Sequence, residues 1–427
     1  MNDKIRNIAI IAHVDHGKTT LVDQLLQKSG TFRDNEAIND RAMDSNDIER
    51  ERGITILAKP TAINYNGYRI NILDTPGHAD FGGEVERIMN MVEGVLLVVD
   101  SYEGTMPQTR FVLKKALEAN VKPIVVINKV DKPTSRVNEV VDEVIDLFIE
   151  LGANDNQLDF KTAYVSALNG TCSLDPDIST QQESYDGLFD LIINEIPAPN
   201  AVVDAPLQFQ PALLDYNEFV GRIGIGKVKS GLIKENEMVS CVRLDGSIKQ
   251  FRIQKLFGYL GLKRIEVKEA YAGDIVAIAG MPDISVGETV CNIGKEQALP
   301  KLRIDEPTLK MTFMTNDSPF AGMEGEFITA RKIEERLFKE TQRDISLRVE
   351  NFEKDSWIVS GRGELHLSIL IENLTHFDEF EENIYKLEGM LYPIVIDKVL
   401  KDEVFDFSDF LTSGGCGGSC GGCEGCH

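Results

Sequence analysis

The sequence predicts three successive folds: a three-layer α/β domain with a mostly parallel sheet, an antiparallel β-barrel, and an incomplete ferredoxin-like α+β domain. In residues 1–200, short β-branched runs, several of them apolar on both faces, alternate with longer amphipathic stretches, which indicates strands covered by helices. In residues 201–305 helical periodicity weakens and turns separate short alternating segments. In residues 306–374 the order becomes strand, helix, strand, strand, helix.

The α/β domain is predicted from five short apolar runs, read as strands at Asn7–Ala12, Tyr68–Leu73, Gly94–Asp100, Pro123–Asn128 and Thr162–Val165. Helices are predicted after Lys18, Gly83, Gln108, Arg136 and Leu188. A domain of this kind binds ligands at the carboxyl ends of its strands. The Pro- and Ala-containing segment Pro197–Asn200 is the expected linker to the next domain.

The remaining domains are predicted from shorter patterns. The barrel includes strands at Phe219–Val228, Met238–Val242 and Asp274–Ala279. The third domain has strands at Thr308–Met314, Ile345–Glu350 and Ser356–Ser360, and helices at Ala330–Thr341 and from Glu364. That order is a split βαβ unit without its last strand. Residues 375–427 form an acidic segment that ends in a Gly- and Cys-rich tail.

The composition excludes several classes of function. With 42% hydrophobic and 27% charged residues, the 427-residue chain has the composition of a globular protein. No apolar run is long enough to span a bilayer, and the N-terminus does not resemble a signal peptide. We therefore expect a cytoplasmic monomer with no membrane partner. The net charge of −24 argues against a protein that binds nucleic acid with its whole surface.

Residues 12–19 match the phosphate-binding pattern G-x-x-x-x-G-K-[ST], except that Ala12 stands first. The segment follows a predicted strand and opens a predicted helix, which is the context of a P-loop. Gly17 allows the backbone N–H groups to point at phosphates, and Lys18 can reach the β- and γ-phosphates. The Thr19 hydroxyl can bind Mg²⁺. Asp15 is unusual beside phosphates, and a monovalent cation nearby would explain it.

Two further segments indicate a nucleotide-sensitive switch. Asp74 ends a predicted strand, where its carboxylate can serve a hydrated Mg²⁺, and Gly77 can bring its N–H to a γ-phosphate. Thr55 lies in a polar loop and can join Mg²⁺ only while a γ-phosphate is present. His78 follows Gly77 directly and is the candidate group that positions the attacking water.

The last pair of motifs selects the base. Asp131, in Asn128-Lys-Val-Asp, can accept hydrogen bonds from N1–H and the 2-amino group of guanine. Adenine offers no such pair, so the site would reject ATP. The segment Ser166-Ala167-Leu168 follows a later strand and can offer a backbone N–H to the 6-oxo group. Together the motifs predict a P-loop GTPase domain.

These motifs resemble those of the translational GTPases. Three longer stretches, Arg41–Lys59, Leu214–Gly226 and Val359–Asn373, resemble the bacterial TypA/BipA family, and the likeness covers about residues 1–373. After Asn373 the sequence departs from the family pattern, as expected of a C-terminally truncated member with an unrelated tail. The missing later domains would weaken ribosome binding, and the missing last strand would lower the stability of the third domain.

The resemblance implies a GTPase that acts on the 70S ribosome or its large subunit and their rRNA, with roles in large-subunit assembly and stress adaptation. It implies Thr19 and Thr55 as Mg²⁺ ligands and His78 as the residue that orients water. It also implies that GTP or GDP is bound by the residues Asp15, His16, Gly17, Lys18, Thr19, Thr20, Asn128, Lys129, Asp131, Ser166, Ala167 and Leu168. Two alternatives remain open: an elongation-factor-G-like or ribosomal-protection factor, and a nucleotide-switched binding module with negligible hydrolysis.

The tail carries a separate pattern. Cys416, Cys420, Cys423 and Cys426 crowd the last twelve residues, embedded in Gly and Ser. Soft thiolates select zinc, Cu(I) or iron–sulfur clusters. The spacing matches no common structural zinc site, so a flexible tail with idle thiols is the alternative.

Overall fold

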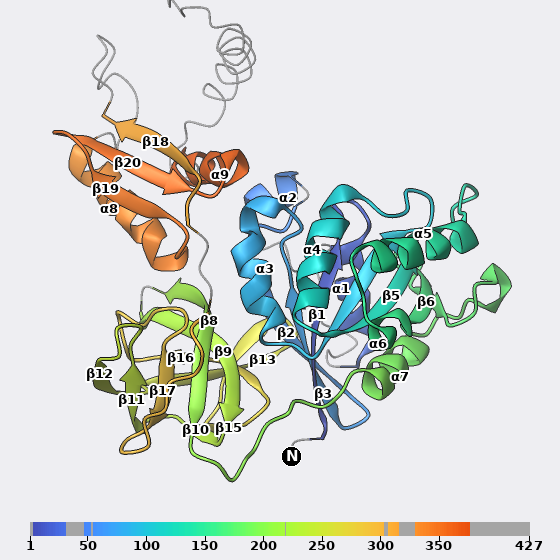
Figure 1. Ribbon diagram of the computed structural model, residues 1–427, viewed down its shortest axis with the longest axis horizontal. Coiled ribbons are helices and arrows are strands. Elements are labelled where there is room, and N and C mark those ends of the chain that lie inside the picture. The colour runs from blue at the N-terminus through green and yellow to red at the C-terminus, as the bar shows by residue number, and fades with distance from the viewer. Residues whose placement is uncertain are drawn as a thin grey trace, which may run out of the picture. The chain divides into compact units, whose positions relative to one another are not determined.

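The computed structural model describes residues 3–30, 47–52, 54–217, 219–302, 306–315 and 329–375 (Figure 1). The chain divides into two compact units, residues 1–316 with 328–370 and residues 317–327 with 371–427. Only residues 371–375 of the second unit are described, so the cysteine cluster of the tail lies outside the described residues. None of the helices described is long and apolar enough to cross a bilayer.

The first domain is the predicted three-layer α/β fold. Its sheet has the strand order β2-β3-β1-β4-β5-β6-β7, and all pairs are parallel except β2–β3 and β6–β7 at the two edges. The strands are β1 (Ile5–Ala12), β2 (Lys59–Tyr65), β3 (Tyr68–Asp74), β4 (Gly94–Asp100), β5 (Lys122–Asn128), β6 (Lys161–Ser166) and β7 (Thr171–Ser173). The five predicted strands are confirmed; the edge strands β2 and β7 were not predicted.

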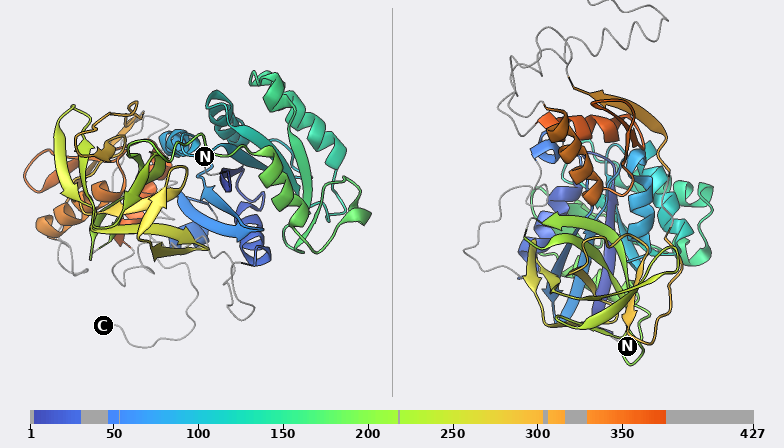
Figure 2. Two further views of the ribbon diagram at one scale, coloured as in Figure 1. Left: turned by 90° about the horizontal axis from the view of Figure 1, so that it is seen from below. Right: turned by 90° about the vertical axis from the view of Figure 1, so that its left-hand side faces the viewer.

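Helices cover both faces of this sheet (Figures 1 and 2). They are α1 (Lys18–Lys28), α2 (Asp47–Arg52), α3 (Gly82–Met89), α4 (Pro107–Glu118), α5 (Val137–Glu150), α6 (Asp155–Leu158) and α7 (Asp186–Glu195). Successive residues of β1 face opposite ways. Ile8 and Ile10 pack with α1 and α7, whereas Ala9 and Ile11 pack with α3, α4 and α5. Burial on both sides explains why the strand sequences are apolar throughout.

The second domain is the predicted antiparallel β structure. An eight-stranded sheet has the order β12-β11-β17-β8-β9-β16-β13-β14, and β10 pairs with β15. The strands are β8 (Gln208–Asn217), β9 (Gly221–Ser230), β10 (Leu232–Lys234), β11 (Met238–Val242), β12 (Ile248–Arg252), β13 (Lys255–Leu260), β14 (Lys263–Glu266), β15 (Glu269–Tyr271), β16 (Ile275–Ala279) and β17 (Thr289–Asn292). Their inward side chains, among them Phe209, Val239 and Val276, form one buried cluster.

The third domain has the predicted order of elements: β18 (Leu309–Met314), α8 (Ala330–Arg343), β19 (Arg348–Asn351), β20 (Ser356–Gly361) and α9 (Glu364–Thr375). The strands form an antiparallel sheet in the order β18-β20-β19. The strand predicted from Ile345 begins only at Arg348. Asp344 explains the delay, because its side chain accepts the N–H of Ser346 at 2.8 Å and turns the chain before β19. No further strand of this sheet occurs in the part of the chain that the structure describes.

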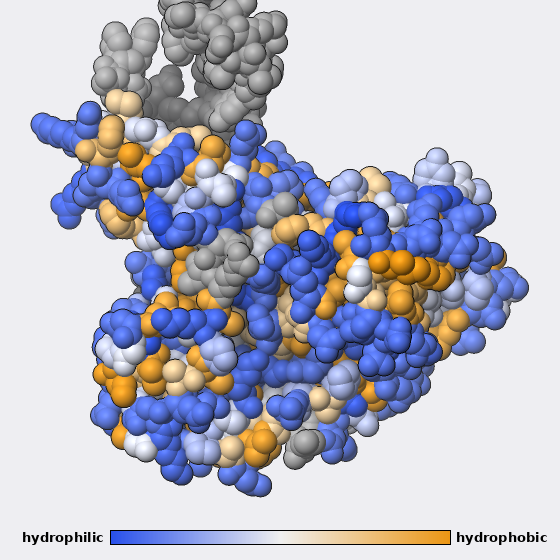
Figure 3. All heavy atoms as spheres, viewed as in Figure 1, coloured by the Kyte–Doolittle hydropathy of each residue, from blue (hydrophilic) through white to orange (hydrophobic). Residues whose placement is uncertain are grey.

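The surface agrees with the composition. Hydrophilic residues cover most of the face shown in Figure 3, and hydrophobic residues form smaller groups between them. Large apolar side chains are instead concentrated in the buried clusters of the first two domains.

Candidate nucleotide-binding site

A cavity of about 430 Å³ lies at the carboxyl ends of β1, β3, β5 and β6. Parallel strands bring these ends to one edge of the sheet, so segments distant in sequence meet there. Most of the sequence-predicted site residues line it: Asp15, Gly17, Lys18, Thr19, Thr20, Thr55, Gly77, His78, Asn128, Lys129, Asp131, Ala167 and Leu168. His13, Gln108 and Lys132, which the motifs did not single out, also line this cavity.

The loop between β1 and α1 curls at Gly17, whose φ of 88° is in the left-handed region that favours glycine. A Cβ at this position would lie 2.3 Å from Nδ2 of Asn128. That amide donates to the carbonyl of His16 at 2.8 Å, and its Oδ1 accepts the N–H of Ala167 at 3.0 Å. Asn128 therefore joins the loop after β1 to the segment after β6, which makes it a brace of the cavity.

Lys18 lines the cavity and pairs with Asp74, which is buried and is not part of the cavity lining. The Lys18 ammonium lies 2.8 Å from Oδ1 of Asp74 and donates to the carbonyl of Thr75 at 2.6 Å. Asp74 is buried, and its Oδ2 accepts a hydrogen bond from the Thr55 hydroxyl at 3.2 Å. The segment that carries Thr55 is thereby joined to the end of β3.

The Thr19 and Thr55 hydroxyls and the Asp74 carboxylate supply oxygen atoms that fit a magnesium ion bound with a nucleotide. Mg²⁺ prefers oxygen ligands and keeps several waters, so it needs few protein groups beside phosphate oxygens. The Thr19 and Thr55 hydroxyls line the cavity, and the buried Asp74 carboxylate is bonded to Thr55. A cluster of three or more His, Cys, Asp or Glu residues able to hold a metal does not occur within the described ranges.

The base side of the cavity is formed by the segments after β5 and β6. Asp131 is exposed and lines the cavity, as does Leu168, whose side chain is 83% exposed. Lys129 has a φ of 62°, and its ammonium donates to the carbonyl of Asp15 at 2.5 Å. The same ammonium lies 2.7 Å from Oδ2 of Asp100. This fixes the lysine stem beside the place where a base would contact Asp131.

Asp100, at the end of β4, is a buried anchor that the motif search missed. Burial raises its pKa, but the bond to Lys129 and the backbone N–H groups of Tyr102 and Glu103 outweigh burial and lower the pKa to about 2. The sequence did contain a signal for this role, because Asp100 is an acidic residue at the end of a predicted strand. Nothing in the sequence identified Lys129 as its partner.

Three predicted site residues, His16, Asp74 and Ser166, are buried and do not line the cavity. His16 Nδ1 accepts the N–H of Asp100 at 3.3 Å, and its Nε2 lies 3.2 Å from a Glu103 carboxylate oxygen. Burial, followed by the neighbouring His13, lowers the pKa of His16 and keeps it neutral. The His16 imidazole thus supports the end of β4, and only its backbone can contact a nucleotide.

His78 lines the cavity at the switch segment after β3. Gly77 precedes it, and a Cβ there would lie 3.0 Å from the carbonyl oxygen of Ala12, so glycine permits the close approach of two loops. His78 Nδ1 accepts the N–H of Asp80 at 3.3 Å and lies 3.4 Å from the Asp80 carboxylate. The imidazole is therefore held by its own loop and directed at the cavity.

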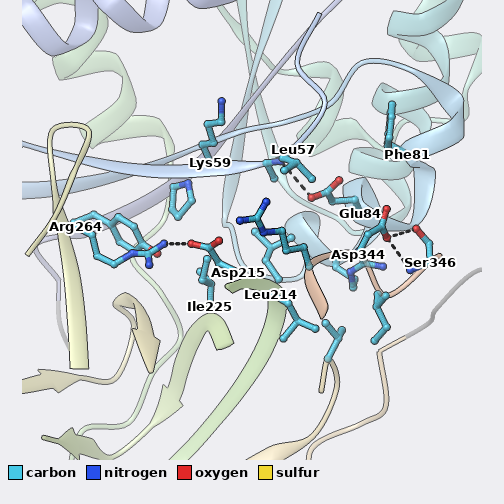
Figure 4. Close-up of a pocket in the computed structure, with 18 of the residues that line it drawn as sticks. Leu57, Lys59, Phe81, Glu84, Leu214, Asp215, Ile225, Arg264, Asp344 and Ser346 are labelled. Carbon is cyan, nitrogen blue, oxygen red and sulfur yellow. Dashed lines mark hydrogen bonds and ion pairs between the residues drawn. The ribbon is translucent and has the colours of Figure 1, made fainter. Parts of the chain in front are cut away.

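A second cavity, of about 380 Å³, contains none of the predicted site residues (Figure 4). It is bordered by β2, α3, the β domain and the third domain. Glu84 accepts the N–H of Ala58 at 3.2 Å, and burial raises its pKa to about 7. Arg264 pairs with Asp215 on another wall. Because most of the residues predicted from the motifs line the other cavity, the first cavity is the candidate site.

The fold and this site define the class: a P-loop domain of the elongation factor Tu type. Residues 3–198 match the elongation factor Tu GTP binding domain, and residues 221–291 match elongation factor Tu domain 2. Over most of its length the chain is 56–63% identical to several bacterial proteins named BipA, so it is similar to that group of translational GTPases. A solved structure of a protein from Thermus thermophilus shares the fold, with a TM-score of 0.65 and 19% identity over 88% of this chain and 66% of that one.

Two curated relatives carry the name large ribosomal subunit assembly factor BipA. The Bacillus subtilis (strain 168) protein is 63% identical over 395 residues, and the Escherichia coli (strain K12) protein is 56% identical over 375 residues. The matches cover 92% and 88% of this chain, and 64% and 61% of the relatives. The chain thus spans less than two thirds of their length. A match over 92% of the chain extends past Asn373, where the resemblance was predicted to end.

Proposed function

We propose that the chain binds guanine nucleotide in the first cavity and hydrolyses GTP to GDP and phosphate. The observation that carries the proposal is the convergence on one cavity of Lys18, Asp131 and His78 from three separate strand ends. The match of residues 3–198 supports it, because the matching domain is described as GTP binding. The Asp131 carboxylate is available to pair with N1–H and the 2-amino group of guanine, and this pair excludes adenine.

The mechanism is positioning and charge neutralisation. Lys18 moves its ammonium from Asp74 to the β- and γ-phosphates, where it offsets the charge that develops during phosphoryl transfer. A Mg²⁺ held by Thr19 and Thr55 supplies further neutralisation when bound. The Thr55 hydroxyl, now bonded to Asp74, would be a ligand for that ion, so the position of its segment would depend on whether a γ-phosphate is bound. His78 orients the attacking water.

We further propose that the chain acts on the ribosome or on assembly of its large subunit, in contact with rRNA. The names of the two relatives support this partner. Their identities of 56–63% also favour this family over an elongation-factor-G-like or ribosomal-protection factor. The stress-adaptation role, the monomeric state and the monovalent cation at Asp15 stay predictions.

The catalytic role of His78 is tested by the His78→Ala variant. We expect its GTP turnover with ribosomes to fall on the order of 10²-fold, the contribution typical of a group that assists proton transfer or orients water. Affinity for GDP should stay within about threefold of the parent, because the phosphate loop and Asp131 are unchanged. Phosphate release is measured under multiple turnover, with labelled GDP titrated in parallel.

The same assay separates the proposal from a nucleotide-switched binding module. A parent chain that binds GTP tightly but releases no phosphate, with or without ribosomes, would support the module. Turnover of His78→Ala equal to that of the parent would refute the catalytic role of His78. Pelleting with ribosomes in a non-hydrolysable GTP analogue then shows whether the chain, at 61–64% of the relatives' length, retains its partner.

The cysteine-rich tail is proposed to bind a soft metal or an iron–sulfur cluster through Cys416, Cys420, Cys423 and Cys426. The chain is expressed aerobically and anaerobically, and its iron, sulfide and zinc are quantified. We expect about one metal ion or cluster per chain under at least one condition, and none after Cys420→Ser with Cys423→Ser. Metal-free protein from both preparations would rule the hypothesis out.

A further inference from the structure

Asp80 contacts the candidate catalytic histidine from the turn that follows it. The turn is the short 3-10 helix Ala79–Phe81. The backbone N–H of Asp80 donates to His78 Nδ1 at 3.3 Å, and the Asp80 carboxylate oxygen Oδ1 lies 3.4 Å from the same nitrogen. The two contacts are alternatives, because an unprotonated Nδ1 accepts the Asp80 N–H whereas a protonated Nδ1 can donate to the Asp80 carboxylate. In either state Asp80 contacts this edge of the ring, so its position decides how the opposite edge of the imidazole is presented.

The other oxygen of Asp80 contacts the third domain. Oδ2 accepts the backbone N–H of Leu365 at 3.2 Å. Leu365 is in the first turn of α9, whose N–H groups have no partner within the helix. The Asp80 carboxylate thus caps α9 from another domain, where the helix dipole favours a negative charge. Both residues belong to the first compact unit.

Gly363 lies against the same carboxylate. A Cβ on Gly363 would come within 2.4 Å of Asp80 Cγ and Oδ2 and within 2.5 Å of Oδ1. Only hydrogen at this position lets the carboxylate reach the N-terminus of α9. The distance is too short for any side chain, so Asp80 would have to move if one were added.

Helix α9 also packs on the segment that carries Thr55. Ile369 of α9 is buried in a cluster with Ile48, Ile56 and Phe81, and Leu365 packs against this cluster. Arg52 donates to the Ser368 hydroxyl at 3.0 Å. One helix of the third domain therefore touches both segments that border the γ-phosphate side of the cavity, residues 48–56 and residues 78–81.

We propose that Asp80 is a positioning residue that links the seating of α9 to the orientation of His78, an inference that rests on the proposed GTPase function. With α9 seated, the Leu365 N–H and Gly363 hold the Asp80 carboxylate, and Asp80 holds His78 Nδ1. When α9 leaves, the carboxylate loses its partner and the imidazole loses its orientation. Hydrolysis then depends on the third domain, although none of the residues described for that domain lines the nucleotide cavity.

The Gly363→Ala variant tests this link without altering any residue of the cavity. Its φ is outside the left-handed region, so alanine is tolerated by the backbone. Gly187→Ala is the matched control, because Gly187 also has an ordinary φ and an added Cβ would meet only Leu174, at 3.5 Å. Asp80→Ala removes the contact from the other side, and Asp80→Asn retains an oxygen that can accept the Leu365 N–H.

Turnover with ribosomes and affinity for GDP are measured for each full-length chain. We expect Gly363→Ala and Asp80→Ala to lower kcat about tenfold while KM and GDP affinity stay within about twofold. The double variant should be no slower than either single one, because both changes break one link. Asp80→Asn should recover part of the loss. If Asp80 only stabilised α9, the variants would unfold more easily but keep the parental kcat.

A second readout does not need hydrolysis. The imidazole signals of ¹⁵N-histidine-labelled chain, which has six histidines, are recorded with GDP bound. We expect the His78 signal, assigned with His78→Ala, to shift in Gly363→Ala and to stay in place in Gly187→Ala. A parent that hydrolyses no GTP, yet shows this shift, would contradict the proposed function and leave the link standing. An unmoved His78 signal together with a parental kcat in Gly363→Ala would overturn the link.

Discussion

Replacing Asp131 by Asn is expected to exchange guanine for xanthine as the preferred base. The carboxylate can accept two hydrogen bonds from guanine, whereas the amide accepts one from N1–H and turns its NH₂ group toward the guanine 2-amino group. Losing a charge-assisted pair costs about 3–6 kcal/mol, so GDP affinity should fall by about 10²- to 10⁴-fold. Xanthosine diphosphate carries a 2-oxo group that the amide can bond, and its affinity should rise.

The measurement is a titration of both diphosphates against parent and variant. Asp131 is exposed, so the fold should be unaffected, and equal thermal midpoints of the two proteins serve as the control. A variant that still binds GDP within threefold of the parent would show that Asp131 does not read the base. The experiment therefore tests the guanine assignment separately from hydrolysis.

The strand ends explain why much of the site could be predicted from the sequence. Ala12, Asp74, Asn128 and Ser166 each end a parallel strand, and parallel topology brings such ends to one edge. A local pattern is then enough to predict a shared cavity. The helix predicted after the phosphate-binding loop is confirmed, because α1 begins at Lys18, whereas the short helices α2 and α6 were not predicted.

Features that depend on long-range pairing were not predictable in this way. The direction of the His16 side chain is decided by contacts with Asp100 and Glu103, more than 80 residues away. Edge strand β2 begins with Lys59-Pro60 and gains its place by pairing with β3. Asp80 and Leu365 are 285 residues apart in the sequence, so no local sequence pattern could predict their contact. In each case tertiary packing, rather than local propensity, determined the outcome.

Gly17→Ala is expected to reduce GDP affinity by at least about 10²-fold, because the added methyl group acts on both sides of the cavity. Alanine at a φ of 88° is strained by about 1 kcal/mol. The larger effect is steric, since the Cβ would lie 2.3 Å from Asn128 Nδ2. Asn128 must then release the His16 carbonyl or the Ala167 N–H, so the phosphate loop and the base segment lose their common brace.

The control for this variant is Gly152→Ala, in the same domain. Gly152 has a φ of 77°, and an added Cβ would meet nothing within 4 Å. Both substitutions therefore introduce similar backbone strain, but only one pushes on Asn128. Labelled GDP titrations and urea midpoints of the two variants separate strain from steric displacement. If Gly17→Ala binds GDP as well as Gly152→Ala, Asn128 does not brace the loop, and the two sides of the cavity hold their shapes independently.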